Sequence, residues 1–582
     1  MRHVITDILI VGSGGAGMRA AVEASCFGDV IVVTKGFAGV DGATVTAQAD
    51  IAVESGYCRE TLSLDGDPDD SMDIFAEDML REGEYLGDER IVSEYVCKSG
   101  DEVRYLSQKG VKLRGLVKNP GHSYPRGVWV SGVELCKALK KDLLSRGNVK
   151  ICEHILLMDI VIEEGRATGA VCFDFIEGTA FLISAGSVVV CSGGAMGLYP
   201  YITAPDGLTG DGMAAAFRAG AELVDMEFPM FLPYSILNPK IVRGVTFTHD
   251  LAMTLDSRAL NREGARFMDK WDPTRMEHTT RDINAAAAGY EIFEGRGSSD
   301  GGVYLSLAHI PHNIIEYSAK WFPETIAEWK CGGFDLRKYL PDLSRDAIET
   351  IPACHFWNGG IKINSEGATS IPGLYAGGEG TGSLHGANRI SGNGVGQALV
   401  WGAIAGRSAG KCSKKLGRPN ISANKAKMML REKSEMIRCK GKEDPAQINR
   451  ELRTMSWECI GLVRTAERLN KFAKYLEQVK KQLMEQKVRS ECVKANRDWL
   501  LMIQNRNLYE IARAVHSAAT ERKESRGAHF RYDHKKTDDE NWTQNIFLRL
   551  KGDEIIVSCS AANNYKGRTP SLNKREYGTK GA

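Results

Sequence analysis

The feature that most constrains the fold of this 582-residue chain is a glycine turn close to its start. Residues 7–12, DILIVG, form a short apolar strand that runs into the turn GSGGAG at 12–17. The next residues, MRAAVEAS, favour a helix, and VIVVTKG at 30–36 predicts a second strand. A G-x-G-x-x-G turn between a strand and a helix is typical of a dinucleotide-binding βαβ unit, whose helix N-terminus receives a pyrophosphate. We therefore predict an α/β, Rossmann-like domain.

The second strand of this unit departs from the usual pattern at its end. It finishes in Thr34 and Lys35, where an acidic residue commonly holds a ribose hydroxyl of NAD. We expect Thr34 or Lys35 to contact the adenosine half of the ligand instead. This departure disfavours NAD and leaves the dinucleotide open on these residues alone.

A second glycine-rich stretch, residues 355–394, interleaves glycine pairs with groups that can bind anions. Glycine permits a positive φ and a close approach of backbone to a ligand, so the stretch suggests a wall against a flat or phosphorylated molecule. The groups between the glycines are His355, Glu379, His385 and Arg389. For any single glycine pair a tight turn in a loop-rich β region is the simpler interpretation, and the stretch by itself names no ligand.

The order of patterns along the chain predicts an interrupted domain followed by a helical one. The strand SVVVC at 187–191 again runs into glycines, and TGDGMAAAFRAGAE at 209–222 predicts a helix with Asp211 near its start. We assign 1–230 with 351–412 to the dinucleotide-binding domain and 231–350 to an inserted α+β domain. Residues 413–530 are predicted to be helical, and 531–582 to form a charged tail.

Composition indicates a large enzyme and disfavours several other classes. The formal charge of +1 gives no electrostatic case for nucleic acid or an anionic membrane as the main partner. The 14 cysteines include no C-x-x-C pair, which argues against an iron–sulfur cluster or structural zinc. His309 and His312 have metal-compatible spacing but lack nearby ligands, so we expect no metal site. Without an apolar run of membrane-spanning length or a signal region, we expect a cytoplasmic location.

Ten motifs in order and spacing make the chain resemble the succinate dehydrogenase/fumarate reductase flavoprotein family, which includes L-aspartate oxidase. The motifs are GSGGAG (12–17), GATVTAQA (42–49), GHSYPRGV (121–128), TGDG (209–212), REGARFM (262–268), RD (281–282), HFWNGGI (355–361), GLYAGGE (373–379), HGANR (385–389) and ERKESRGAHFR (521–531). The resemblance implies FAD, bound by the Rossmann-like domain, with an α+β capping domain inserted and a C-terminal helical domain.

The resemblance also assigns residues to the cofactor. It places FAD against the first glycine turn, the segment from Thr44 to Gln48, Asp211, and Glu379, which holds the ribityl chain. The backbone at Gly394 and Val395 is expected to lie against the isoalloxazine ring. The complete set of expected FAD contacts is Gly12, Gly14, Gly15, Ala16, Gly17, Thr34, Lys35, Thr44, Ala47, Gln48, Asp211, Glu379, Asn393, Gly394 and Val395.

For the substrate, the resemblance implies that His355 and Arg389 hold a carboxylate, with Thr248 as a further contact. Arg281 matches the family's proton-transferring arginine. A carbon–carbon double bond beside a carboxylate takes a hydride from flavin N5 on one carbon and a proton on the other, and cationic groups stabilise the charge that develops. Because arginine is a poor acid, Arg281 needs a relay that returns its proton.

Three positions depart from the family pattern. Ala43 stands where covalently flavinylated members have a histidine, so we expect non-covalent FAD and favour the reductive direction or an aspartate-oxidase-like use. Leu232 replaces a histidine that binds a substrate carboxylate, which implies a substrate that is less charged or larger at that end. His249 replaces the glutamate of the proton relay, and we count it with the candidate catalytic residues.

Simpler interpretations stand beside these roles. A lone His355 would most often be a core or turn histidine, and Arg281 with Asp282 could be a surface ion pair. Two hypotheses therefore remain: a catalytic flavoprotein subunit that exchanges electrons with a separate iron–sulfur protein, or an FAD-binding electron-transfer component without turnover. L-aspartate oxidase is the alternative within the enzyme class. Any membrane contact, at the inner face, is expected only through partner subunits.

Overall fold

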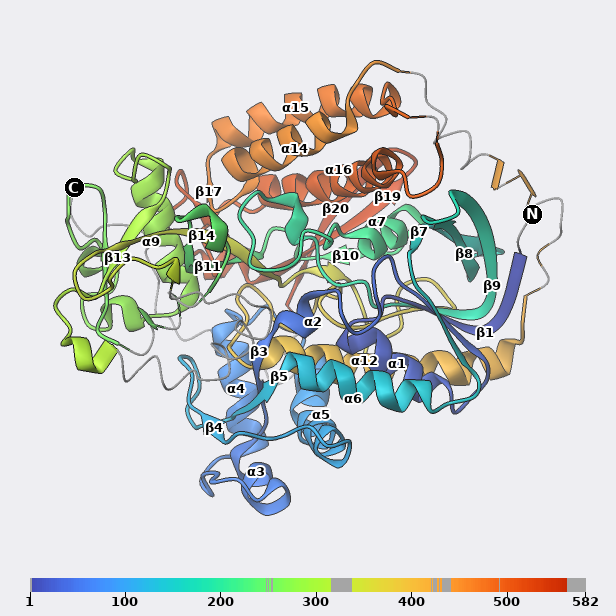
Figure 1. Ribbon diagram of the computed structural model, residues 1–582, viewed down its shortest axis with the longest axis horizontal. Helices are drawn as coiled ribbons and strands as arrows, with labels where there is room; N and C mark the ends of the chain where they lie inside the picture. The colour runs from blue at the N-terminus through green and yellow to red at the C-terminus, as the bar shows by residue number, and fades with distance from the viewer. Residues whose placement is uncertain are drawn as a thin grey trace.

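The computed structural model describes residues 3–246, 249, 251–252, 255–315, 338–419, 421, 427–428, 430–431, 441–490 and 492–562. Thr248 lies outside these residues. A seven-stranded sheet forms the centre of the N-terminal part, in the order β6-β2-β1-β9-β8-β7, with β16 also paired to β9 (Figure 1). Its strands are β1 (His3–Val11), β2 (Val30–Val33), β6 (Val149–Cys152), β7 (Ile155–Glu163), β8 (Arg166–Asp174), β9 (Thr179–Val190) and β16 (Leu374–Ala376).

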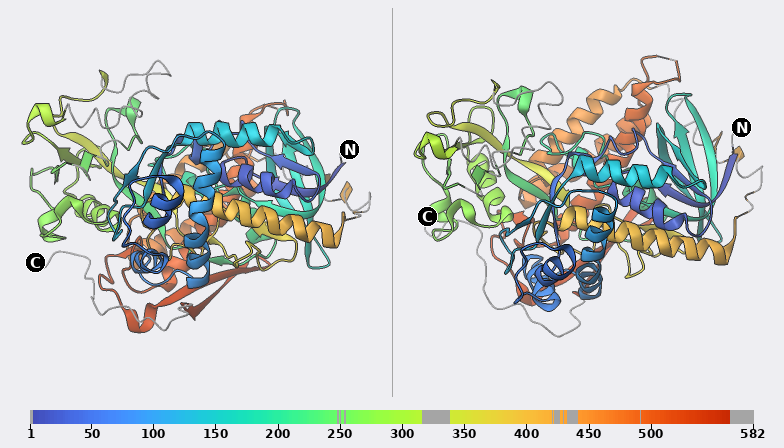
Figure 2. Two further views of the ribbon diagram at one scale, coloured as in Figure 1. Left: turned by 90° about the horizontal axis from the view of Figure 1, so that it is seen from below. Right: turned by 60° about the horizontal axis from the view of Figure 1, so that its bottom comes forward.

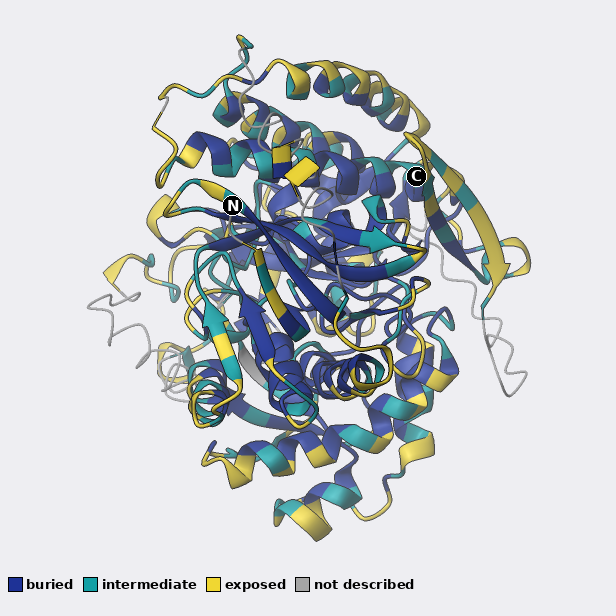
Figure 3. Ribbon diagram, turned by 90° about the vertical axis from the view of Figure 1, so that its right-hand side faces the viewer, coloured by how far each residue is buried: buried dark blue, intermediate teal, exposed yellow. Residues whose placement is uncertain are grey.

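The sheet is parallel where the cofactor is expected and antiparallel beyond it. Strands β1, β2, β6, β9 and β16 run parallel, whereas β8 pairs antiparallel with both β9 and β7. Residues Ile8 to Ile10 of β1 are fully buried, as expected for a strand covered on both faces. The burial colouring shows this sheet as the dark centre of the domain (Figure 3). The glycine turns thus follow the carboxyl ends of β1 and β9, where α/β sheets bind ligands.

Helices α1 (Gly15–Ala24) and α12 (Asn393–Leu416) pack against each other beside this sheet. A Cβ at Gly406 would lie 2.2 Å from the carbonyl oxygen of Ala20, so the two backbones are in direct contact. The glycines of α12 therefore allow the approach, and they bring together segments from opposite parts of the chain. The neighbouring elements are α2 (Ala43–Thr46), β3 (Gln48–Ala52), α3 (Ser55–Leu62), α4 (Met72–Glu82), α5 (Glu89–Gln108), β4 (Leu116–Val117), β5 (Gly127–Ser131) and α6 (Gly132–Leu144).

A separate antiparallel sheet, which we call the capping sheet, stands to one side of the Rossmann-like part (Figure 2). Its order is β11-β14-β13-β12, and helix α9 packs against β11, β13 and β14. The elements are β11 (Pro229–Ile236), β12 (Arg258–Leu260), α9 (Arg281–Phe293), β13 (Val303–Ser306) and β14 (Ile348–Trp357). Strand β14 returns from this sheet toward the first domain, so its end lies at the junction of the two.

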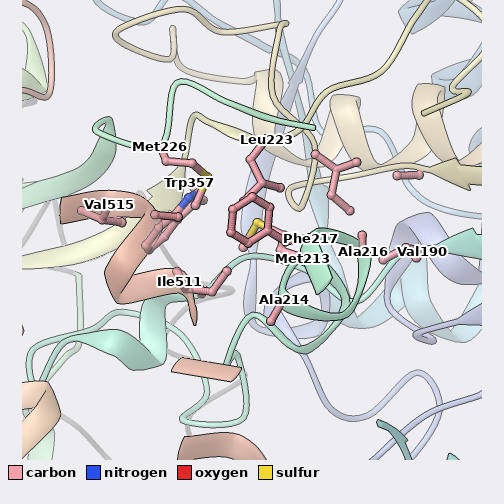
Figure 4. Close-up of a cluster of buried hydrophobic side chains, with 14 of the residues drawn as sticks. Val190, Met213, Ala214, Ala216, Phe217, Leu223, Met226, Trp357, Ile511 and Val515 are labelled. Atoms are coloured by element: carbon pink, nitrogen blue, oxygen red, sulfur yellow. The ribbon is translucent and has the colours of Figure 1, made fainter. Parts of the chain in front are cut away.

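Three long helices pack together over the other side of the molecule: α14 (Pro445–Ile460), α15 (Ala466–Met484) and α16 (Arg497–Glu521) (Figure 1). Helix α16 also packs on α7 (Asp211–Arg218). Figure 4 shows the apolar cluster at this contact, where Ile511 and Val515 meet Met213, Phe217 and Trp357. One continuous core therefore joins the helices to the dinucleotide-binding domain, and the predicted fold class is confirmed; the domain boundaries stay predictions.

The segment assigned to a charged tail contains regular structure within its described residues, 531–562. Strands β19 (Gln544–Lys551) and β20 (Glu554–Ala561) form an antiparallel hairpin, and β19 pairs with β10 (Leu223–Val224). Alternate residues Ile546 and Leu548 are fully buried, a period that the charged residues before them obscure. Within the same segment lies the short helix α17 (Asp539–Trp542). Two short strands from elsewhere in the chain, β15 (Gly360–Ile361) and β17 (Val463–Arg464), pair with β10 and with β18 (Phe530–Arg531). Among the described residues, no helix is long and apolar enough to cross a membrane.

Candidate active site

The first glycine turn has a geometry that only glycine tolerates. Gly12 has φ +106°, and a Cβ there would lie 2.2 Å from the carbonyl oxygen of Cys191. The turn is therefore wedged between the ends of β1 and β9. Helix α1 starts at Gly15, and its N-cap residue Gly14 makes no side-chain capping hydrogen bond. The helix start thus retains the amide groups that suit a phosphate.

The segment 44–48 lies against this turn, as the sequence predicts. The amide of Gly15 donates to the hydroxyl of Thr44 over 3.1 Å. The carbonyl of Ala47 accepts from the amide of Gly132 at 2.9 Å, which fixes the segment to α6. Gln48 begins β3. The candidate contacts from the glycine turn and from 44–48 therefore belong to one wall.

Lys35 and Asp211 meet as an ion pair. The Lys35 ammonium lies 2.5 Å from the carboxylate of Asp211 and 2.8 Å from the hydroxyl of Thr209. Burial alone would raise the pKa of Asp211, but the charge of Lys35 and the hydrogen bonds to the carboxylate outweigh burial and lower it. Asn507 of α16 donates to the same carboxylate at 2.8 Å. Asn507 was missed from the sequence because it belongs to no motif.

Glu379 joins three segments at the second glycine wall. Its carboxylate accepts from the amides of Gly194 and Trp357, each over 3.2 Å. Burial raises its pKa to about 7, against the pull of these two amides and of Arg389. The turn after β9 and the end of β14 are thus tied to Glu379, as the two separate glycine patterns suggest.

The start of α12 supplies buried polar atoms without partners. Asn393 is fully buried, and neither polar atom of its side chain has a hydrogen-bond partner among the described residues. A Cβ at Gly394 would lie 3.2 Å from Phe356 and 3.4 Å from Arg389, so only glycine leaves this surface clear. Buried amides are normally satisfied, and here a flat, hydrogen-bonding ligand would satisfy them. The donor set and the cleared backbone fit FAD.

Four cationic or imidazole side chains converge next to this wall: His249, Arg281, His355 and Arg389. Burial lowers the pKa of Arg389, and the charge of Arg281 lowers it further. Burial, followed by the charges of Arg389 and Arg281, holds the pKa of His355 well below its usual range. Burial and Arg281 do the same for His249. Both histidines are therefore neutral in the folded protein, and the charges of the two arginines act on one another. We call these four residues the cation cluster.

Each member of the cation cluster is oriented by the fold. Arg389 is 6% exposed, and its guanidinium stacks over Phe356 with 4.4 Å to the ring centroid. Nδ1 of His355 lies 2.7 Å from the hydroxyl of Thr203, a contact that no sequence pattern indicates. Arg281 is the first residue of α9. His249 is 2% exposed, and its ring nitrogens have no hydrogen-bond partner within the described part of the chain.

Two other candidates neighbour this cluster without belonging to it. His385 is buried, with Nε2 2.8 Å from the side-chain oxygen of Gln397, and burial lowers its pKa to about 3. Leu232 is buried in β11 opposite Ala353, two residues before His355 in β14. A cavity of about 340 Å³ lies beside the same two strands. Its lining includes Tyr201, Ser235, Ile236, Arg243, Ile351 and Ala353.

Comparison with known proteins agrees with this geometry. The FAD binding domain family matches residues 7–395, and the family described as fumarate reductase flavoprotein C-term matches 449–573. One subunit of the fumarate reductase (CoM/CoB) of Methanothermobacter marburgensis is 33% identical, over 94% of this chain and 97% of that protein. The L-aspartate oxidase of Vibrio cholerae is 29% identical, over 91% and 95%. The solved structure of Mycobacterium smegmatis Sdh1 is similar with a TM-score of 0.85 and 26% identity, covering 98% of this chain and 96% of that one.

Fold, site and relatives together define an FAD-dependent oxidoreductase. The chain belongs to the succinate dehydrogenase/fumarate reductase flavoprotein family, whose succinate dehydrogenases and fumarate reductases act on CH–CH groups. The family and the cofactor predicted from the motifs are thereby confirmed. The roles of the individual residues stay predictions, and Thr248 lies outside the described residues.

Proposed function

We propose that this chain transfers a hydride between FAD and a carbon–carbon bond adjacent to a carboxylate, as the flavoprotein subunit of a fumarate reductase-like complex. The cation cluster is the observation that carries the proposal. Arg389 is buried, the charge of Arg281 lowers its pKa, and two neutral histidines lie beside it. An anion that enters such a site is stabilised by the buried positive charge. A substrate carboxylate is the anion that suits a site beside the start of α12, where we expect the flavin to lie.

In this proposal His355 and Arg389 hold the carboxylate. The planar guanidinium of Arg389 suits a carboxylate fork, and the stacking on Phe356 fixes its plane. Nδ1 of His355 is engaged by Thr203, which leaves Nε2 to face the substrate as a neutral group. FAD supplies the hydride at N5. Both side chains also stabilise the negative charge that builds up on the carboxylate as the bond is reduced.

Arg281 gives the proton to the second carbon. Arg281 is the first residue of α9, the helix that packs on the capping sheet. His249 lies close enough for the charge of Arg281 to lower its pKa, and a neutral imidazole can both accept and donate a proton. We therefore propose His249 as the group that returns a proton to Arg281, in the place of the family's glutamate.

The electron partner and the substrate are part of the same proposal. Among the described residues, no group of three or more His, Cys, Asp or Glu could hold a metal ion, so electrons would pass to or from a separate iron–sulfur protein. Fumarate is the substrate named for several relatives. Leu232 in place of a histidine favours an unsaturated acid that is larger or less charged at one end. A cytoplasmic location, with membrane contact only through partners, stays our expectation.

A steady-state assay tests the proposal. The purified FAD-loaded chain is supplied with reduced dye and a panel of unsaturated mono- and dicarboxylates, and oxidation of the dye is followed. We expect turnover on at least one member. No turnover on any of them, with FAD bound, would leave the second hypothesis, an electron-transfer component without its own substrate.

The L-aspartate oxidases among the relatives justify one alternative. Those enzymes share about the same identity with this chain as the bacterial fumarate reductase flavoproteins do. Under air, L-aspartate oxidation would release hydrogen peroxide and, after hydrolysis, oxaloacetate and ammonia. Detection of these three products from L-aspartate, without turnover of unsaturated acids, would favour the alternative.

A further inference from the structure

A serine outside the family motifs hydrogen-bonds the guanidinium of Arg281 beside the start of α12, where FAD is expected to bind. Its Nη2 donates to Oγ of Ser391 over 3.1 Å. Ser391 is 8% exposed and lies in the turn between Arg389 and α12. Arg281 itself belongs to the capping side of the site. This contact therefore joins the capping side of the site to the turn before α12, and it sets where the guanidinium lies relative to that turn.

Ser391 is in turn fixed through its backbone by a buried histidine. Nε2 of His122 lies 2.9 Å from the carbonyl oxygen of Ser391. Because a carbonyl only accepts, Nε2 carries the proton, and Nδ1 is the acceptor that faces Nη1 of Arg126 at 3.3 Å. Burial lowers the pKa of His122, and Arg126 adds to this effect. His122 is thus neutral, in one defined tautomer.

Behind His122 lies a rigid ion-pair group. The fully buried guanidinium of Arg126 binds Asp70 through Nε at 2.7 Å and Nη2 at 2.6 Å, and binds Asp78 through Nη1 at 2.6 Å. The side chains of both aspartates are at most 1% exposed. A bidentate pair with a second carboxylate leaves the arginine little freedom. A continuous series of contacts therefore runs from Asp70 through Arg126, His122 and Ser391 to Arg281.

We propose that His122 and Ser391 are positioning residues for Arg281. Arg126 and its two carboxylates fix the His122 ring, the ring fixes the turn at residue 391, and the Ser391 hydroxyl aims the guanidinium at the substrate carbon. The proposal rests on the proton role of Arg281 in the proposed function. A long, unrestrained arginine would sample many rotamers, and small misplacements cost about 10²-fold in rate.

Two pairs of variants test this series of contacts. Ser391→Ala removes the hydroxyl, whereas Ser391→Thr keeps one. His122→Phe removes the donor to residue 391, whereas His122→Gln keeps a side-chain N–H. Ser187→Ala is the matched control, because it removes a buried serine hydroxyl that donates to the carbonyl of Ala409, outside these contacts. FAD content and melting temperature show which variants are folded; if His122→Phe is not, the Ser391 pair carries the test.

Kinetics provide the first readout. In Ser391→Ala and His122→Phe we expect kcat to fall about 10- to 100-fold with KM within about 3-fold of wild type, because the carboxylate is held by other residues. Ser391→Thr and His122→Gln should recover most of the loss, and Ser187→Ala should stay within about 2-fold. Equal losses in the hydroxyl-removing and hydroxyl-keeping variants would overturn the proposal.

The second readout does not depend on turnover. Phenylglyoxal reacts with accessible arginines, and mass spectrometry of the Arg281 peptide gives the rate of its modification. A guanidinium that has lost the Ser391 contact samples more rotamers, so it should react at least about 5-fold faster in Ser391→Ala than in wild type or Ser187→Ala. Unchanged labelling would refute the positioning role. If wild type turns over no carboxylate, the proposed function fails, and the labelling rates alone decide whether Ser391 holds Arg281.

Discussion

Two groups of arginines in this protein differ in how their charge is balanced. In the first, which we call the paired cluster, Arg522 and Arg526 meet Glu227 and Glu524, and all four side chains are fully buried. In the cation cluster, the buried Arg389 lies near Arg281 and two neutral histidines instead. Burial of a charge is tolerated when a partner compensates it. Each arginine of the first group has a carboxylate partner in the folded chain, whereas we expect the second group to be completed by an anion.

The hydrogen bonds show the same difference. Arg522 donates to Glu227 at 2.8 Å, to Glu524 at 2.9 Å and to the carbonyls of Trp542 and Gln544. Nε of Arg389 has no partner among the described residues, and the fields of Asp50 and Glu379 oppose the effect of Arg281 on its pKa. The paired cluster joins the C-terminal segment to the residues before β11. Within the part of the chain that the structure describes, the buried Arg389 of the cation cluster has no carboxylate partner of the kind that Arg522 has, as we expect of an anion-binding site.

The largest effect should come from the cation cluster and should concern activity alone. Arg281→Ala removes the proposed proton donor, and loss of a general acid costs about 10²- to 10⁴-fold in rate. Because it also relieves repulsion with Arg389, we expect unchanged or slightly raised thermal stability. Turnover of the best substrate, FAD absorbance and melting temperature check this. Retained turnover with bound FAD would refute the proton role.

The corresponding change in the paired cluster should affect stability instead. Arg522→Met leaves Glu227 and Glu524 without their shared partner, and such losses cost about 3–5 kcal/mol of unfolding free energy. Denaturant unfolding measures the effect. The double variant Arg522→Met with Glu227→Gln should recover part of it, because one stranded charge is removed. If Arg281→Ala proves the more destabilising of the two, the distinction between the clusters is wrong.

The sequence predicts local backbone geometry well and contacts between distant segments poorly. The turn at Gly12 and the strands around it follow from local geometry, since close packing at the strand ends leaves no room for a Cβ at Gly12 or Gly17. His355 and Arg389 stood out in the glycine-rich stretch as groups that can bind anions, but their roles, and Arg281 itself, came only from the family motifs. Thr203, His122, Ser391 and Asn507 act through contacts between distant segments, and single Ser, Thr, His or Asn residues carry no periodicity that could reveal them. The C-terminal hairpin was missed because charged residues at 533–540 obscured the alternation that follows.

A pH dependence should appear at the edge of the paired cluster. Burial and the neighbouring Glu227 raise the pKa of Asp225 to about 8. The folded protein therefore binds a proton that the unfolded chain has lost, and stability falls as pH rises from about 4 to about 8, by about 1.4 kcal/mol per pH unit at most. Asp225→Asn cannot titrate, so its melting temperature should decline less than that of wild type across the upper half of this range. Parallel curves for both proteins would contradict the shift.

The smallest effect should come from adding a group to the cation cluster. Leu232 lies opposite Ala353, two residues before His355, so Leu232→His introduces an imidazole on the strand next to the carboxylate clamp. We expect about a 10-fold gain in kcat/KM for a small dicarboxylate relative to a monocarboxylate, about the worth of one charge-assisted hydrogen bond. Leu232→Asn is the control, since it adds polarity at this position without an imidazole. Competition between fumarate and a monocarboxylate of similar length measures the ratio, and an unchanged ratio would mean that residue 232 does not face the substrate.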